Sequence, residues 1–168
     1  MIVNLRKDHI LELSENFIGQ GWDSRDKVLN KYLEEQQLGK RIVLVYEEND
    51  KCKGYITLNI NPSEGPFSKL NIPEISDFNV FEKYQRNGIG QKLLEEIINL
   101  SKETSNLVGI GVGLHAGYGP AQRMYIRNGF IPDGKGVYYK GKILEPYVEC
   151  FNDDDLALYF IKNTKSNY

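Results

Sequence analysis

Two glycines, Gly88 and Gly90, open an amphipathic stretch that follows a strand-like run ending at Phe81. The free N–H groups at the start of a helix converge on one point, and the helix dipole adds partial positive charge there. Because glycine lacks a Cβ atom, a phosphate can approach this backbone closely, and Arg86 can add a fork of charged donors. These residues predict a site for the diphosphate of a nucleotide-like ligand.

The spacing around these glycines does not fit two common phosphate-binding motifs. A Walker loop requires four residues and then Gly-Lys-Ser/Thr after its first glycine, and no such lysine follows Gly88. A dinucleotide fingerprint requires a third glycine, where this chain has Leu93. The pattern that remains is Gln85-x-x-Gly88-x-Gly90, directly after a strand-like run.

This pattern resembles the acetyl-CoA-binding signature of the GNAT superfamily of N-acetyltransferases, Gln/Arg-x-x-Gly-x-Gly/Ala. A second segment resembles the later helix of that family, Asn-x-x-Ala-x-x-Leu-Tyr-x-x-x-Gly-Phe, with matches at Ala121, Tyr125, Gly129 and Phe130. Tyr118 stands where the family usually has Asn. The two segments follow the order of the family, and the resemblance covers residues 73–132.

The resemblance implies acetyl-CoA as the co-substrate and expects no metal. In the family, the strand before the glycine loop splays from its neighbour, so that its backbone groups pair with the pantetheine amides. Here that role falls to Phe78 and Val80, whose N–H groups could also polarise the thioester carbonyl. The cofactor-binding residues implied in this way are Phe78, Val80, Gln85, Arg86, Asn87, Gly88, Ile89, Gly90, Gln91 and Ala121.

Acetyl transfer to an amine needs a base, because an ammonium group with a pKa of about 10 must first lose its proton. It also benefits from an acid that protonates the leaving thiolate. The resemblance places the Tyr125 phenol near the cofactor sulfur as that acid, and places Glu74 where some family members carry a glutamate base. Asp77 is a rival base, since a carboxylate inside an apolar strand needs a partner or a cleft. Because side chains alternate along a strand, Glu74 and Asp77 should face opposite sides unless a bulge intervenes.

The elements around these motifs predict an α+β fold. Helical spacing of apolar residues predicts helices over 8–17, 27–37, from Gly88 to 104, and 120–128. Runs rich in β-branched and aromatic residues predict strands over 41–47, 53–60, 74–81 and 107–114, with two more between 136 and 162. Ser24 is the candidate N-cap of the second helix. We expect one GNAT-like domain over residues 1–168, with a mixed, mainly antiparallel central sheet flanked by helices.

The strand over 107–114 contains the alternating glycines Gly109, Gly111 and Gly113. This Gly-x-Gly-x-Gly pattern resembles a nucleotide-binding motif, but no helix begins after it. Close backbone packing or an open strand edge accounts for the pattern better.

The composition is typical of a soluble globular protein rather than a nucleic-acid-binding protein. The 168 residues carry a formal net charge of −2, which argues against nucleic acid as a partner because phosphate neutralisation needs a basic face. No run approaches the ~18 apolar residues of a membrane span, and the segment after Met1 lacks an apolar signal core, so we expect a cytoplasmic location. Cys52 and Cys150 form neither a zinc nor a redox motif.

The sequence does not identify the acceptor. In this fold it meets segments that correspond here to 19–25, with Trp22 and Asp23, and 61–71, with Glu64 and Phe67, although both are also ordinary surface loops. Acids and aromatic rings there would suit a cationic amine. We expect a small-molecule amine rather than a protein tail, and a homodimer is possible.

Two other readings of the function stay open. The chain could be a catalytically idle module that binds acyl-CoA as a sensor or assembly component, or an enzyme that transfers a longer acyl group. For an acetyltransferase we expect direct transfer in a ternary complex, because neither motif contains a cysteine that could carry the acetyl group.

Overall fold

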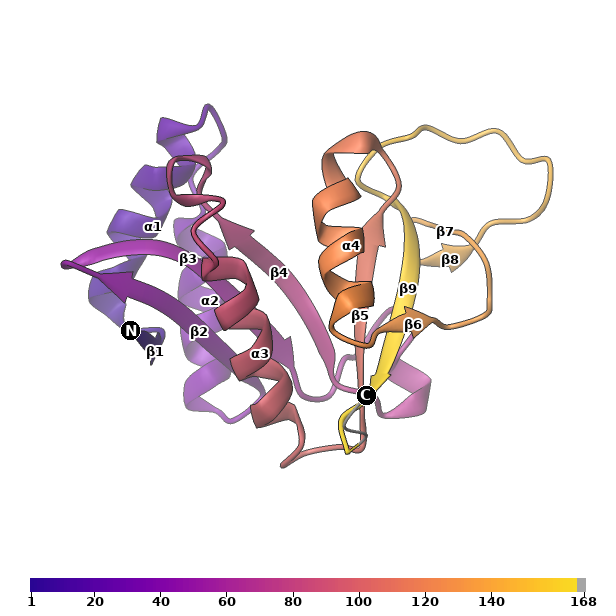
Figure 1. The fold of residues 1–168 in the computed structure, drawn as a ribbon, viewed down its shortest axis with the longest axis horizontal. Helices are drawn as coiled ribbons and strands as arrows, with labels where there is room; N and C mark the ends of the chain where they lie inside the picture. The colour runs from indigo at the N-terminus through magenta and orange to yellow at the C-terminus, as the bar shows by residue number, and fades with distance from the viewer. Residues whose placement is uncertain (166–168) are drawn as a thin grey trace. The chain divides into compact units, whose positions relative to one another are not determined.

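The computed structural model describes residues 1–165. Within this range the chain forms four α-helices and nine strands (Figure 1). The helices are α1 (Lys7–Gly19), α2 (Asp26–Gln37), α3 (Ile89–Ser101) and α4 (Gly119–Arg127). The strands are β1 (Ile2–Asn4), β2 (Arg41–Glu48), β3 (Lys51–Asn59), β4 (Glu74–Val80), β5 (Leu107–Gly113), β6 (Ile131–Pro132), β7 (Tyr138–Tyr139), β8 (Lys142–Ile143) and β9 (Leu156–Asn163). Short 3₁₀ helices are η1 (Ser68–Leu70), η2 (Glu82–Tyr84) and η3 (Ala116–Tyr118).

The strands form one sheet in the order β1-β2-β3-β4-β5-β9-β7-β8, with β6 also paired to β9. The pairing is antiparallel between β1 and β2, between β2 and β3, and at each of the three neighbours of β9. It is parallel between β4 and β5, where Glu74 pairs with Gly109 and Ile75 with Ile110. The prediction of an α+β fold with a mixed, mainly antiparallel sheet is therefore confirmed.

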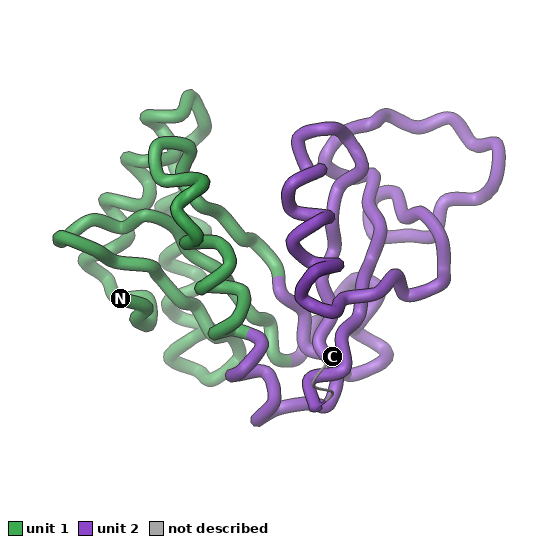
Figure 2. Tube along the Cα trace, viewed as in Figure 1, with its two compact units in different colours: residues 1–60, 76–97 green, residues 61–75, 98–168 purple. Residues whose placement is uncertain are grey.

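The chain divides into two compact units (Figure 2). Unit 1 comprises Met1–Ile60 and Ser76–Ile97, and unit 2 comprises Asn61–Ile75 and Ile98–Tyr168. Both β4 and α3 contribute residues to each unit. The prediction of a single domain over the whole chain stays a prediction.

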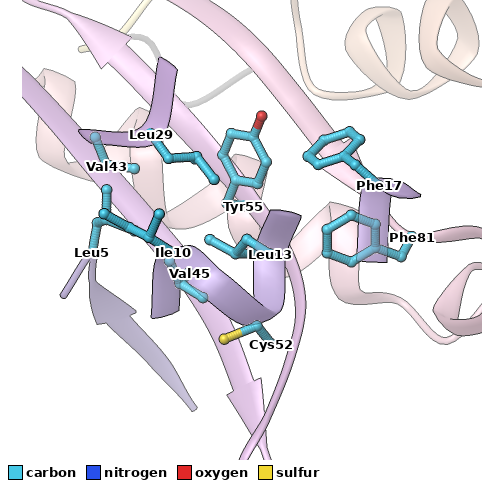
Figure 3. Close-up of a cluster of buried hydrophobic side chains, with 10 residues drawn as sticks. All are labelled: Leu5, Ile10, Leu13, Phe17, Leu29, Val43, Val45, Cys52, Tyr55 and Phe81. Carbon is cyan, nitrogen blue, oxygen red and sulfur yellow. The ribbon is translucent and has the colours of Figure 1, made fainter. Parts of the chain in front are cut away.

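The core of unit 1 forms where one face of α1 packs on β2 and β3 (Figure 3). Ile10, Leu13 and Phe17 follow helical spacing, so their side chains project from the same face of α1 and become buried. Phe17 makes edge-to-face contacts with Tyr55, at 6.2 Å between ring centroids, and with Phe81, at 5.1 Å. Phe81 immediately follows β4, so this core fixes the end of the strand that leads into the glycine loop.

In unit 2, aromatic rings lie directly against the glycines of β5. A Cβ atom at Gly109 would lie 2.4 Å from the ring of Phe67, and one at Gly111 would lie 2.9 Å from the ring of Tyr159. Contacts this short exclude a side chain, so close packing accounts for these glycines, as predicted. Phe67, which the sequence placed in an acceptor-facing loop, is only 1% exposed and belongs to this packing.

Two local predictions were wrong. Arg25, not Ser24, is the N-cap of α2, although the Ser24 hydroxyl still accepts a hydrogen bond from the Asp26 N–H at 3.3 Å. The chain beyond residue 136 forms three strands, the two-residue β7 and β8 and the longer β9, rather than the two strands predicted. The tight β7–β8 turn depends on left-handed backbone at Lys140 and Gly141, which the sequence reading did not recognise. No helix within residues 1–165 is long and apolar enough to cross a membrane.

Candidate active site

The glycine loop lies in unit 1, between the end of β4 and the start of α3. Its backbone is left-handed at Arg86, with φ 62°, and at Gly88, with φ 74°. Left-handed backbone favours glycine, which explains this residue type at position 88. A Cβ atom built on Gly88 meets no protein atom within 4 Å, so the space above this residue is open. The Gly88 carbonyl accepts from the Lys92 N–H at 3.1 Å, and the first N–H groups of α3 therefore follow directly after the open glycine.

Side-chain amides stabilise this loop through hydrogen bonds to backbone carbonyls. Gln85 Nε2 donates to the Val80 carbonyl at 2.9 Å, linking the loop to the end of β4. Asn87 Nδ2 donates to the carbonyls of Tyr84 and Gln85 at 3.2 and 3.1 Å. The Ile89 side chain is buried, so this residue could serve a ligand only through its backbone. Arg86 is exposed at the loop surface. The cofactor-binding roles of all these residues stay predictions.

Asp77, the rival base, is the centre of a hydrogen-bond network in unit 1. Its Oδ1 accepts from the phenol of Tyr55 and from Asn79 Nδ2, each at 2.8 Å. Its Oδ2 accepts from the guanidinium of Arg25 and, at 3.0 Å, from the phenol of Tyr32. A φ of 51° at Asp77 interrupts the regular alternation of side chains along β4. With both oxygens engaged by protein donors, this carboxylate is a poor candidate for removing a proton from an acceptor.

Glu74, the preferred base, lies in unit 2 at the start of β4. It pairs with Gly109 of β5 and is partly buried. A Cβ atom on Gly65 would lie 4.0 Å from Glu74 Oε2, so the carboxylate borders the loop over 61–71. Burial raises the pKa of Tyr159, and the charge of Glu74 adds to this effect.

Tyr125 projects from α4 into the interior of unit 2. Only 6% of the residue is exposed, and the centroid of its ring lies 6.1 Å from the centroid of the Phe130 ring. Burial raises the pKa of Tyr125, and the nearby Tyr118 phenol adds to this effect. The side chain is therefore a neutral phenol near pH 7, which can donate a hydrogen bond. Ala121 lies one helical turn earlier on the same face of α4.

Tyr118 is held by a polar cluster that the sequence did not reveal. Its hydroxyl donates to Asp154 Oδ1 at 2.8 Å, and the same oxygen lies 3.1 Å from His115 Nε2. Burial and this hydrogen bond raise the pKa of Tyr118 to about 12. A Cβ atom on Gly113 would lie 2.3 Å from the Tyr118 ring, which explains the third glycine of β5. No local pattern links Asp154 to residues so distant in the chain.

Comparison with known proteins identifies the family. The model of the acetyltransferase (GNAT) family matches residues 8–130. This chain belongs to the GNAT acetyltransferase family. The match covers both segments that carried the resemblance in the sequence. No curated protein sequence matches the chain.

Solved GNAT structures share the fold over nearly the whole chain. A ribosomal-protein-alanine N-acetyltransferase from Brucella melitensis has a TM-score of 0.71 and 20% identity, covering 97% of this chain and 99% of its own. A putative acetyltransferase from Salmonella typhimurium, determined with its cofactor acetyl-CoA, has a TM-score of 0.71 and 19% identity, covering 99% of this chain and 95% of its own. An aminoglycoside 6'-acetyltransferase type Ii has a TM-score of 0.66 and 15% identity, covering 100% of this chain and 99% of its own. At these identities the likeness establishes the GNAT fold.

The predicted site residues of this GNAT chain are divided between the two units. Unit 1 contains the glycine loop and the strand residues Phe78 and Val80, and unit 2 contains Glu74, Ala121 and Tyr125. Within residues 1–165, no group of three or more His, Cys, Asp or Glu side chains could hold a metal ion.

Proposed function

We propose that this protein is an N-acetyltransferase that moves the acetyl group of acetyl-CoA directly to a primary amine within a ternary complex. The observation that carries the proposal is the glycine loop, open above Gly88 at the start of α3, in a chain of the GNAT acetyltransferase family. The acetyl-CoA bound by a structural neighbour supports the choice of co-substrate.

Acetyl-CoA would bind with its diphosphate at the loop over 85–91. The N–H groups at the start of α3 favour a negative group there, and the exposed Arg86 adds positive charge. The backbone of Phe78 and Val80 would pair with the pantetheine amides and orient the thioester. Such positioning of two bound reactants contributes a large part of the acceleration that is available to this reaction.

Two side chains would then manage the protons. Glu74 would accept the proton of the acceptor ammonium group, which frees the lone pair that attacks the thioester carbonyl. Tyr125 would donate a hydrogen bond to the thiolate as the carbon–sulfur bond breaks, and the thiolate would take up the second proton that the nitrogen loses when it becomes an amide. Because its pKa is raised, we assign Tyr125 a stabilising hydrogen bond rather than complete proton transfer.

The proposed acceptor is a small-molecule amine. GNAT structures with this fold are named both for a ribosomal-protein alanine and for an aminoglycoside, so the fold accommodates either kind of acceptor. In this chain Trp22 is 56% exposed beside Phe17, and an exposed ring can bind a cationic amine through its face.

The proposal is tested with purified protein, acetyl-CoA and a panel of primary amines, following free thiol and the mass of the amine product. Release of thiol that requires both the protein and a particular amine supports it. Tight binding of acetyl-CoA without transfer to any amine would instead indicate the idle acyl-CoA-binding module. A parallel series with longer acyl-CoA donors identifies the preferred acyl group.

A further inference from the structure

Asp77 combines two features that an ordinary strand residue does not have. Its backbone is left-handed, with φ 51°, in the middle of β4. Non-glycine residues rarely adopt this conformation, and they persist in it only where the surroundings hold them. Its side chain is 12% exposed and accepts hydrogen bonds on both carboxylate oxygens.

Three of the donors to Asp77 come from two other elements, α2 and β3. Arg25 is the N-cap of α2, Tyr32 lies within α2, and Tyr55 lies on β3. The guanidinium of Arg25 also lies over the ring of Phe17, at 5.4 Å, which limits its movement. Burial and the charge of Asp77 raise the pKa of both tyrosines, so both phenols stay protonated as donors. The Asp77 carboxylate thus joins α2 and β3 to β4.

The residue before Asp77 is fixed in the same way. Arg41 Nη1 donates to the hydroxyls of Ser76, at 3.1 Å, and Thr57, at 3.0 Å. The Thr57 hydroxyl donates to the Ser76 carbonyl at 2.5 Å, and Arg41 lies over the ring of Tyr32 at 4.4 Å. Two consecutive residues of β4 are therefore held by buried polar groups, immediately before Phe78.

We propose that Asp77 is a positioning residue, which holds the backbone of Phe78–Val80 in the conformation that receives the pantetheine arm of acetyl-CoA. The proposal rests on the proposed function. It follows from continuity of the chain, because the dihedral angles at Asp77 set the direction of the peptide groups that follow. The Arg25 guanidinium is the charged partner that keeps the carboxylate in place.

The test uses Asp77→Asn, Arg25→Met and the double variant. Asparagine has the size of aspartate and tolerates left-handed backbone, but it has no charge to pair with Arg25 and only one terminal oxygen to accept from the donors on both sides. Calorimetry measures the affinity for acetyl-CoA and, separately, for adenosine 3′,5′-bisphosphate, which has no pantetheine. We expect each single variant to bind acetyl-CoA at least about fivefold more weakly and the nucleotide with unchanged affinity. The double variant should bind no more weakly than the weaker single variant, because both changes remove the same interaction.

Conservative variants and a surface control separate positioning from stability. Arg25→Lys keeps a cation near Asp77 and should restore part of the affinity lost in Arg25→Met. Asp8→Asn removes a fully exposed carboxylate that pairs with Arg6, and it should leave acetyl-CoA affinity unchanged. Asp77→Gly keeps the left-handed backbone available without a carboxylate, and it should also weaken acetyl-CoA binding. It replaces Asp77→Asn if that protein does not fold.

The outcomes are distinguishable. If wild-type protein binds acetyl-CoA and folded Asp77→Asn or Asp77→Gly binds it equally well, Asp77 has no positioning role and the proposal fails alone. If the variants lose nucleotide and acetyl-CoA affinity to the same extent, the effect is not confined to pantetheine and the proposal also fails. If wild-type protein binds neither ligand, the proposed function fails, and the positioning role of Asp77 fails with it.

Discussion

Replacing Gly88 by alanine is expected to weaken acetyl-CoA binding in a protein that still folds. The φ of 74° at Gly88 is costly for a residue with a Cβ atom, by roughly 1–2 kcal/mol. For a chain of this size, that cost corresponds to a decrease in Tm of roughly 2–8 °C. The new methyl group meets no protein atom within 4 Å, so steric conflict with the fold adds nothing.

The same methyl group would occupy the space that the phosphate needs. A phosphate oxygen must come within about 2.9 Å of a backbone N–H to accept a hydrogen bond from it. We therefore expect acetyl-CoA to bind at least about tenfold more weakly, a loss of about 1.4 kcal/mol or more. Calorimetry on the folded variant measures this directly, and Gly88→Val should have the larger effect.

A matched control separates backbone strain from ligand contact. Gly134 lies on the surface of unit 2 with φ 80°, and a Cβ atom there also meets nothing within 4 Å. Gly134→Ala should lower Tm to a similar extent and leave acetyl-CoA affinity unchanged. Equal affinities for wild type and folded Gly88→Ala would refute the reasoning that places the diphosphate at this loop.

Three further outcomes are expected. Tyr125→Phe should lower kcat at least about tenfold, with little change in acetyl-CoA affinity, because a hydrogen bond to a charged group such as the leaving thiolate contributes about 1.5–3 kcal/mol. Unchanged turnover at saturating acetyl-CoA would show that Tyr125 serves packing alone. Glu74→Gln should lower kcat/KM most near neutral pH and least at high pH, where free amine is abundant, whereas Asp77→Asn should lower it by the same factor across the pH range. The reverse pattern would make Asp77 the base, and a silent Glu74→Gln would leave the acceptor to lose its proton by another route. Burial lowers the pKa of His9 below its ordinary 6.5, so as pH falls the imidazole becomes protonated in the unfolded chain before it does in the folded protein. The free energy of unfolding should therefore decrease as pH falls below about 6.5. Chemical denaturation of His9→Gln should show no such decrease between pH 6.5 and 5, and an identical decrease in this variant would show that other groups cause it.

Local sequence patterns predicted the parts of this fold that depend on neighbouring residues. The spacing of Ile10, Leu13 and Phe17 places all three on one helix face, and Gly129, with φ 83°, ends α4 as expected. The open loop at Gly88 likewise depends on backbone requirements within a few residues. The sequence predicted these features because each depends only on residues that are close together in the chain.

The polar networks could not be predicted, because their members meet only after folding. Asp77 was read as a possible base, yet its donors Arg25, Tyr32 and Tyr55 come from other elements. The hydrogen bond from Tyr118 to Asp154 spans 36 residues. Alternation along a regular strand also gave no indication of the left-handed conformation at Asp77. Such contacts depend on tertiary packing rather than on local spacing.

The most direct test of the central claim is a quenched reaction of purified protein with acetyl-CoA and a reactive amine, analysed by mass spectrometry. The account predicts one acetylated amine for each thiol released, with no acetyl group on the protein at any time. Acetyl-CoA that stays bound and intact in the presence of every amine tested would contradict it.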